Sequence, residues 1–356
     1  MTPTRTLRLV AIAASALLLA ACAPAPAKST GSPTPTAAAF CARMVTDSGG
    51  LDDKSFNESS WAGMQKAQKQ LGIGARVLVS TTDTDLAPNV EQAAESGCGF
   101  VLTVGYSLAD ATAAQAKAHP TTDFAIVDEV VDAPNVKPIV FDTAQAAYLA
   151  GYLAAGVSKT GKVATFGGGN QPPVTLFMDG FVDGVAEYNT VHKTHVKALG
   201  WNKTKQDGQF TGDFENVAKG RTYAQNFIDQ GADVILPVAG QVGTGAASAA
   251  LDAKNVSIIW VDNDGYNTLP AEDKPIVLTS VIKNTEDAVA QIVGTSVDGS
   301  FTNKEFVGTL ANGGVSIAPF HDKAASVSAA LASEIDALKA KIVSGALVVT
   351  SPSTPK

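Results

Sequence analysis

Residues 45–61, VTDSGGLDDKSFNESSW, decide the fold of this chain. The stretch begins at the end of an apolar strand, Gly49 and Gly50 permit a tight turn with positive φ, and Ser55 stands where a helix N-cap is expected. A strand, a turn and a helix start in succession are typical of an open α/β sheet, in which ligands bind at the carboxyl ends of the strands. The pattern predicts the floor of a binding cleft, lined by Asp47, Phe56 and Asn57.

Short apolar strands and amphipathic helices alternate along the rest of the chain. The first series comprises residues 42–46, 59–70, 75–79, 86–95, 100–104, 108–118 and 123–127. The second comprises residues 162–166, 174–188, 195–200, 215–230, 234–237, 245–254 and 257–261. Such alternation predicts α/β structure with parallel sheets flanked by helices. Residues 40–356 are enough for two such domains.

The N-terminal sequence has the features of a targeting signal. Arg5 and Arg8 precede an apolar run at residues 9–21, and residues 18–22, LLAAC, place small residues before a cysteine. This resembles a bacterial lipoprotein signal, which implies cleavage before Cys22 and lipid on its sulfur. The alternative, a transmembrane helix, is disfavoured because such a helix needs about 20 apolar residues.

Residues 23–39 consist of Ala, Pro, Ser, Thr and Gly with one Lys and are too poor in bulky apolar side chains to form a core. We therefore expect a signal peptide at residues 1–21, followed at residues 22–39 by the lipidated cysteine and a flexible tether. The protein is then expected at the cell membrane, lipid-anchored on the extracytoplasmic face.

Composition and motifs argue against several other classes of protein. The formal net charge is −8 and basic residues are not clustered, so a nucleic-acid partner is not expected. Of the four histidines only His192 and His195 are close, and their spacing alone does not make a metal site. Phosphate-loop, dinucleotide-binding and nucleophile-elbow motifs are absent from the sequence. We therefore predict no metal, no cofactor and no enzymatic activity.

Two cysteines remain once Cys22 is assigned to lipid. Cys41 and Cys98 each lie at the start of a predicted strand, and these strands are the first and third of a doubly wound sheet, where they are neighbours. The positions favour a disulfide in a compartment that permits one. The alternative is a pair of small buried thiols.

Several segments resemble the basic membrane lipoprotein (BMP) family, the substrate-binding proteins of nucleoside ABC importers, and in particular its purine nucleoside receptor lipoproteins. Among them are GYLAAGVSKTGKVATFG, PVTLFMDGFVDGV and GADVILPVAGQVGTG. The matching segments are residues 44–65, 151–167, 173–185, 231–245, 260–264, 278–283 and 313–315.

The resemblance implies a type I periplasmic-binding-protein-like fold, with two lobes joined by three crossovers. We expect hinges near residues 141–144, 262–266 and 312–319. The N-terminal lobe is then expected at residues 40–142 plus 263–312, and the C-terminal lobe at residues 143–262 plus 313–350.

The same resemblance assigns the nucleobase side of the site. It implies that Asp47 and Asn57 bind the base and that Phe56 offers a stacking face, which is worth roughly 1 to 3 kcal/mol. Asp128, after a predicted strand, is a further acceptor for the base edge. Phe177 either flanks the base from the other side or packs in the core.

The ribose side is assigned in the same way. Asp262 and Lys283 correspond to the family's ribose contacts, and Gly240 lets backbone amides approach the sugar. A buried carboxylate that accepts from two hydroxyls uses charge-assisted bonds, which favours ligands with an intact ribose.

Each of these residues also has a purely structural interpretation. Asp47 and Asp262 are alternatively turn or cap residues, Phe56 a hydrophobic staple, and Lys283 a solvated surface lysine. The chain also departs from its relatives at Leu236, where many of them carry an aromatic residue, and after Asp262, where Asn263 and Tyr266 are expected to alter the ribose or hinge contacts.

The sequence therefore predicts a monomeric, lipid-anchored solute-binding protein of an ABC importer. It is expected to capture a nucleoside, with a purine base, between its lobes and to deliver it to the permease by hinge closure. The alternatives are a different small solute, such as a sugar, or an extracytoplasmic hydrolase acting on nucleosides.

Overall fold

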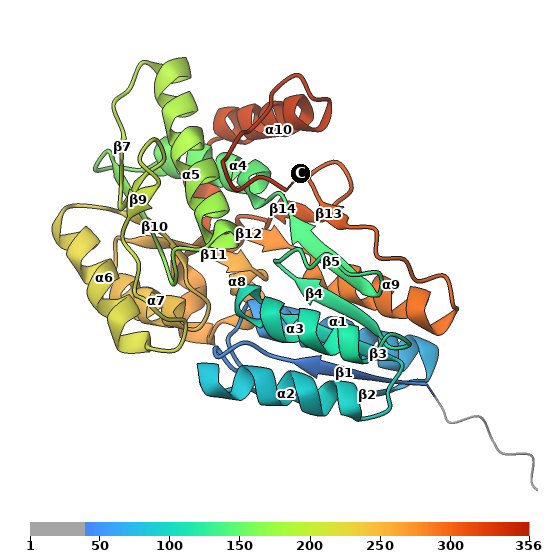
Figure 1. Ribbon diagram of the computed structural model, residues 1–356. Helices are drawn as coiled ribbons and strands as arrows, with labels where there is room; N and C mark the ends of the chain where they lie inside the picture. The colour runs from blue at the N-terminus through green and yellow to red at the C-terminus, as the bar shows by residue number, and fades with distance from the viewer. Residues whose placement is uncertain (1–39, 356) are drawn as a thin grey trace, which may run out of the picture. The chain divides into compact units, whose positions relative to one another are not determined.

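The computed structural model describes residues 40–355. The predicted signal peptide, the lipidated Cys22 and the tether lie outside the described residues. Two six-stranded sheets with helices on both faces make up the described part of the chain (Figure 1). The predicted α/β class is thereby confirmed.

The first sheet contains parallel strands in the order β13-β5-β4-β3-β1-β2. Its strands are β1 (Cys41–Val45), β2 (Gly74–Leu78), β3 (Phe100–Val104), β4 (Asp123–Val127), β5 (Val136–Phe141) and β13 (Phe306–Gly308). In β4, Phe124 and Ile126 pack into one hydrophobic cluster while Ala125 and Val127 pack into another. This alternation buries both faces of the sheet, as a parallel sheet requires.

Four helices cover the first sheet. They are α1 (Phe56–Leu71), α2 (Asp83–Glu95), α3 (Ala109–Ala118) and α9 (Thr285–Val297). Helix α1 packs against α9, and α2 packs against α3. Buried residues of α1 and α9 join the cluster of Ala125 and Val127, whereas those of α2 and α3 join the cluster of Phe124 and Ile126. The two pairs therefore cover opposite faces.

The second sheet has the order β14-β12-β11-β10-β6-β7. Its strands are β6 (Lys162–Gly167), β7 (Lys197–Leu199), β10 (Val234–Val238), β11 (Ser257–Asp262), β12 (Val277–Lys283) and β14 (Val315–Ile317). All the pairings are parallel except that of β14 with β12. A two-stranded hairpin of β8 (Trp201–Asn202) and β9 (Asp207–Gly208) follows β7.

Helices also cover both faces of the second sheet. They are α4 (Thr143–Val157), α5 (Pro172–His192), α6 (Val217–Asp229) and α7 (Val242–Ala253), with the short α8 (Gly265–Thr268) and the C-terminal α10 (Ala329–Val343). Helices α4 and α5 pack together, as do α6 and α7. A Cβ atom at Gly151 of α4 would lie 2.0 Å from the carbonyl oxygen of Phe181 in α5. The glycine of the GYLAAG motif is therefore needed for the close approach of these two helices.

The chain crosses between the sheets three times. The crossings follow β5 at residues 141–143, β12 at residues 283–285 and β13 at residues 308–315. The second was expected near residues 262–266, and this expectation was wrong. Because β12 pairs in parallel with β11, residues 263–283 stay with the second sheet, and the return to the first sheet begins at Asn284. Figure 1 shows α9, in orange, among the blue and green elements of the first sheet.

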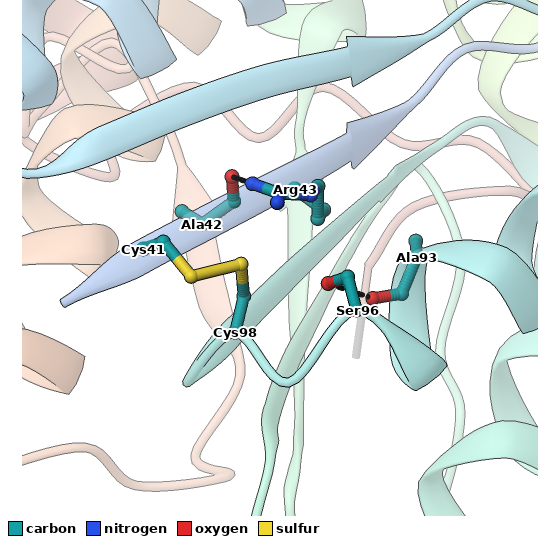
Figure 2. The surroundings of a disulfide bond; sticks show 6 residues. All are labelled: Cys41, Ala42, Arg43, Ala93, Ser96 and Cys98. Atoms are coloured by element: carbon teal, nitrogen blue, oxygen red, sulfur yellow. Dashed lines mark hydrogen bonds between the residues drawn. A yellow bond between two sulfur atoms is a disulfide. The ribbon is translucent and has the colours of Figure 1, made fainter. Parts of the chain in front are cut away.

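Cys41 and Cys98 form a disulfide in the structure, with Cα atoms 4.8 Å apart (Figure 2). Cys41 begins β1, and Cys98 lies in the loop that leads into β3, the strand that pairs with β1. The bond closes a loop across a sequence separation of 57 residues. In the chain-entropy account, closing a loop of this length stabilises the fold by about 4 kcal/mol. The bond lies at the amino ends of the strands, the end opposite the predicted cleft.

Candidate functional site

A cavity lies where the carboxyl ends of strands from both sheets converge. It contains about 710 Å³ of space between atoms, part of it open to solvent. Seven of the eight predicted binding residues line it: Asp47, Phe56, Asp128, Phe177, Gly240, Asp262 and Lys283. The eighth, Asn57, is not part of the lining.

Asp47 follows β1, and Asn57 holds it in place. The Asn57 side-chain amide donates to Asp47 Oδ1 at 2.6 Å, and the Gly49 amide donates to the same oxygen at 2.9 Å. Among the described residues, none donates a hydrogen bond to Oδ2. Asn57 therefore positions Asp47 from behind, and Oδ2 of Asp47 remains available as an acceptor.

Burial changes the acidity of Asp47. It raises the pKa of the carboxyl from 3.8 to about 6, against the opposing effect of the hydrogen bonds from Asn57 and Gly49. Near neutral pH the group is ionised, and below pH 6 it is protonated. An acceptor with this pKa is sensitive to modest acidification.

Asp53, a cavity residue that the sequence analysis did not single out, caps α1. Its carboxylate accepts from the backbone amides of Ser55, Asn57 and Glu58 at 2.7 to 3.1 Å. Ser55 was expected to provide the cap, but its side chain makes no cap bond and its Oγ is buried without a partner. Burial raises the pKa of Asp53 to about 7, and the three amide bonds work against this increase.

Lys283, at the end of β12, carries the positive charge of the cavity. Its side chain is only 4% exposed, and Nζ lies 2.5 Å from Asp128 Oδ2 and 3.4 Å from Asp262 Oδ1. Burial disfavours the charged amine, but the two carboxylates outweigh it and raise the pKa of Lys283. Because Asp128 belongs to the first sheet and Asp262 to the second, this lysine joins acids from both lobes. The solvated surface position considered for Lys283 is wrong.

The two acids beside Lys283 sit on unusual backbone. Asp128 follows β4 with φ of 65°, and Asp262 ends β11 with φ of 67°. Few residues other than glycine adopt this left-handed conformation, although Asp does so more readily than most. Asp262 Oδ1 is buried and accepts no hydrogen bond, with only the lysine ion pair nearby. Its remaining acceptor capacity suits a hydroxyl group of a ligand.

Aromatic rings from both lobes face the cavity. Lys283 Nζ lies 4.5 Å from the ring centre of Phe56 and 5.5 Å from that of Phe177. Phe177 is 2% exposed and belongs to the hydrophobic core, so it both packs in the core and borders the cavity. Phe214, between β9 and α6, supplies a further ring that the sequence analysis missed. It packs on Gly168, where a Cβ atom would lie 2.4 Å from the ring.

The profile of a family described as "ABC transporter substrate-binding protein PnrA-like", named Bmp, matches residues 41–352. The chain belongs to the Bmp family. The resemblance identified in the sequence is thus confirmed, and the chain is a substrate-binding protein of the ABC transporter type. Bmp proteins are solute-binding proteins of ABC transporters.

Curated Bmp relatives cover most of the chain. The ABC transporter nucleoside-binding protein BmpA of Lactococcus lactis subsp. cremoris is 35% identical over 294 residues, covering 78% of this chain and 80% of the relative. A CD4+ T-cell-stimulating antigen of Listeria monocytogenes is 32% identical, covering 87% of this chain and 88% of the relative. Basic membrane protein A of Borreliella burgdorferi is 28% identical, covering 85% and 86%.

Solved structures support the Bmp fold. An ABC transporter solute-binding protein from Aeropyrum pernix K1 superposes with a TM-score of 0.79 at 22% identity, covering 88% of this chain and 94% of that protein. One from Conexibacter woesei gives 0.69 at 22% identity, covering 89% and 100%. At these identities the likeness concerns the fold, and it agrees with the type I architecture expected from the sequence.

Three residues that depart from the Bmp pattern lie outside the cavity lining. Leu236 is fully buried in the hydrophobic core and is not among the cavity residues. The ring of Tyr266 stacks on His321 at 4.1 Å between centres, outside the lining. Asn263 also lies outside the lining, where its amide reaches the first lobe.

Residues 40–355 of this Bmp protein contain neither a membrane-spanning helix nor a metal-binding cluster. Within this part of the chain, no helix has the length and apolar character needed to cross a membrane. Nor do three or more His, Cys, Asp or Glu side chains gather there in a group able to hold a metal ion.

Proposed function

We propose that this Bmp protein binds a nucleoside, with a purine base, in the cavity between its lobes and delivers it to the permease of an ABC importer. The observation that carries the proposal is the group of Asp128, Lys283 and Asp262, which is buried beside aromatic rings. It combines a polar end with an apolar wall in one cavity. A nucleoside has the matching division into a hydroxylated sugar and a flat base.

The polar end suits a ribose. Vicinal hydroxyls donate well to carboxylates, and Asp262 Oδ1 is buried without a hydrogen bond. Lys283 is held charged by its two acids and can donate to a hydroxyl or ring oxygen. Gly240, with φ of 52°, presents backbone without a side chain to the same cavity. These groups favour a ligand that retains its sugar.

The apolar wall suits a base. Phe56 comes from the first lobe, and Phe177 and Phe214 come from the second. Rings from both lobes allow contact with both faces of a flat ligand, which favours the larger purine system. Asp47 Oδ2 offers an acceptor for the N–H groups of the base edge, and Asn57 keeps that carboxylate in position. The name of the nucleoside-binding relative BmpA agrees with this assignment.

Binding by residues of both lobes couples the ligand to lobe closure. A ligand that contacts Phe56 and Asp128 on one side and Asp262 on the other stabilises the arrangement in which the two sets are close. The three crossings at residues 141–143, 283–285 and 308–315 are the proposed hinge. We propose that the protein works as a monomer. We also propose that its N-terminal lobe comprises residues 40–142 and 284–312.

Calorimetry with nucleosides and with their parts tests the proposed ligand. We expect guanosine, inosine or adenosine to bind, and cytidine and uridine to bind more weakly. Free bases and ribose each lack half of the contacts and should bind more weakly still. At a hundredfold excess over its Kd, a bound nucleoside should stabilise the fold by about 2.7 kcal/mol in thermal unfolding. A response to a sugar without any response to nucleosides would keep the transport role but reject the ligand.

The same solutions address the hydrolase alternative. Chromatography of the nucleoside after prolonged incubation should recover it unchanged, because the proposed site holds a ligand without reacting with it. Appearance of free base and ribose in proportion to the amount of protein would instead identify a hydrolase.

We propose further that Cys22 carries the lipid that anchors the protein on the extracytoplasmic face of the membrane. Residues 23–39, rich in Ala and Pro, would then act as the tether. We expect the wild type in the membrane fraction and Cys22→Ser in the soluble fraction, measured by fractionation and immunoblotting. Retention of Cys22→Ser in membranes to the wild-type level would reject the lipid anchor.

A further inference from the structure

Three side chains of the second lobe donate hydrogen bonds to two backbone carbonyls of the first lobe. Trp260 Nε1 and Thr268 Oγ1 each donate to the carbonyl oxygen of Lys54 at 3.1 Å. Asn263 Nδ2 donates to the carbonyl oxygen of Ser55 at 3.0 Å. We call these five residues the clasp. The acceptors precede α1, and the donors lie on β11, on α8 and between them.

The donors of the clasp are fixed within the second lobe. Trp260 is fully buried, and a Cβ atom at Gly265 would lie 2.6 Å from it, so its indole has little room to move. Thr268 is the last residue of α8, whose first turn is capped by the Asp264 side chain. The indole N–H of Trp260 and the hydroxyl of Thr268 are therefore already in position, so little conformational freedom is lost when they bind the first lobe.

The acceptors are equally well held within the first lobe. Asp53 accepts from the backbone amides of Ser55, Asn57 and Glu58, which fixes the start of α1. Lys54 adopts a φ of 61°, a backbone conformation that is uncommon for a side chain of this kind. The donors and the acceptors of the clasp are therefore each held in place by their own lobe, and they come together at the contact between the lobes.

The clasp lies outside the ligand cavity. None of its five residues belongs to the described lining. By contrast, the ion pair of Lys283 with Asp128 joins the lobes inside the cavity, where a ligand reaches it. The clasp residues are therefore not expected to contact a ligand, although they adjoin Asp53, Phe56 and Asp262 of the lining in the sequence.

We infer that the clasp stabilises the closed arrangement of the lobes and so sets ligand affinity and residence time without touching the ligand. In an open arrangement, water hydrates the two carbonyls and the three donors. In the closed one, loss of both donors leaves the Lys54 carbonyl without a partner, which costs free energy in that state alone. The Ser55 carbonyl still accepts from the Ser59 amide when Asn263 is lost. Apparent affinity falls with the fraction of protein that can close. The inference rests on lobe closure in the proposed function, but not on which ligand binds.

The double variant Trp260→Phe with Thr268→Val tests this inference. It keeps the aromatic and branched shapes and removes both donors to Lys54. The protein is the chain from residue 22 with Cys22→Ser, and the ligand is guanosine. We expect the Kd to rise about tenfold, mainly through faster dissociation in stopped-flow fluorescence. Small-angle X-ray scattering of the ligand-free protein should show a larger open fraction than in the wild type.

Trp201→Phe is the matched control. It also removes an indole hydrogen bond, from Trp201 Nε1 to Asp179 Oδ1 at 2.7 Å, but within the second lobe. We expect it to lower the Tm while leaving the Kd for guanosine and the scattering unchanged. If the double variant fails to fold, Asn263→Ala removes the remaining donor and should give a smaller change in the same direction.

The outcomes separate the clasp from the proposed ligand. Unchanged dissociation and scattering in a folded clasp variant would overturn the inference, and so would equal changes in Trp201→Phe. If guanosine does not bind the wild type, the ligand assignment fails, and the scattering comparison alone decides the role of the clasp.

Discussion

Replacing Lys283 with methionine is expected to lower the free energy of unfolding by about 3 to 5 kcal/mol. The lysine side chain is 4% exposed and pairs with Asp128 and Asp262, each 8% exposed. Methionine fills similar space but leaves two buried carboxylates without their cation. We also expect nucleoside binding to be lost, because the same lysine holds the polar end of the cavity. Urea unfolding followed by circular dichroism measures the first effect, and calorimetry measures the second.

Lys66→Met is the control for this substitution. Lys66 also pairs with two acids, Glu286 and Asp287, but its side chain is 34% exposed. Water solvates these acids when the lysine is removed, so we expect a loss of at most about 1 kcal/mol and no change in ligand affinity. Equal stability losses in the two variants would contradict the role assigned to the burial of Lys283.

The strands that end at the cavity were predictable from local pattern. The apolar runs predicted at residues 123–127 and 257–261 became β4 (Asp123–Val127) and β11 (Ser257–Asp262). Asp128 was expected at the cleft from its place after a strand, and Asp262 was expected there from the family resemblance; both line the cavity. From position alone, Asp262 was equally compatible with a turn or cap residue.

The sheet to which β12 belongs was not predictable in the same way. Residues 277–283, VLTSVIK, are buried almost throughout, which is typical of a central strand but suits either sheet equally. The sheet of β12 is determined by its pairing with β11, in which Trp260 lies opposite Ser280 and Val261 opposite Val281. The misplaced boundary at residue 263 came from the family resemblance, and the local pattern of β12 could not correct it.

The missed cavity residues share a related cause. Phe214 lies in an irregular segment without periodicity, and its position comes from packing on Gly168, 46 positions earlier in the sequence. The contact of Lys283 with Asp128 spans 155 residues. Asp53 caps α1 although it lies two residues before Ser55, the position at which an N-cap is usually expected. The positions of these side chains depend on three-dimensional packing, which local sequence pattern does not encode.

Acidification from pH 7 to pH 5 is expected to weaken nucleoside binding about tenfold. The pKa of Asp47 is raised to about 6, chiefly by burial. In the proposed complex the ionised carboxylate accepts from the base, so a proton on Asp47 competes with the ligand at pH values below 6. Calorimetry at pH 5, 6, 7 and 8 measures the dependence. Asp47→Asn should bind roughly 10- to 100-fold more weakly at pH 7, since a charge-assisted bond is lost, and its affinity should not vary around pH 6.

Stability should respond to pH in the opposite direction. A carboxyl whose pKa is higher in the folded than in the unfolded chain contributes stability that is fully present below the unfolded value, near 3.9, and is lost as the pH rises through about 6. Asp47 therefore favours the ligand-free fold at pH 5 and the ligand complex at pH 7. Asp53, with a pKa of about 7, adds to the stability trend, so Asp47→Asn should flatten the affinity profile more completely than the Tm profile. An affinity profile that keeps its wild-type slope in Asp47→Asn would exclude Asp47 as the titrating contact.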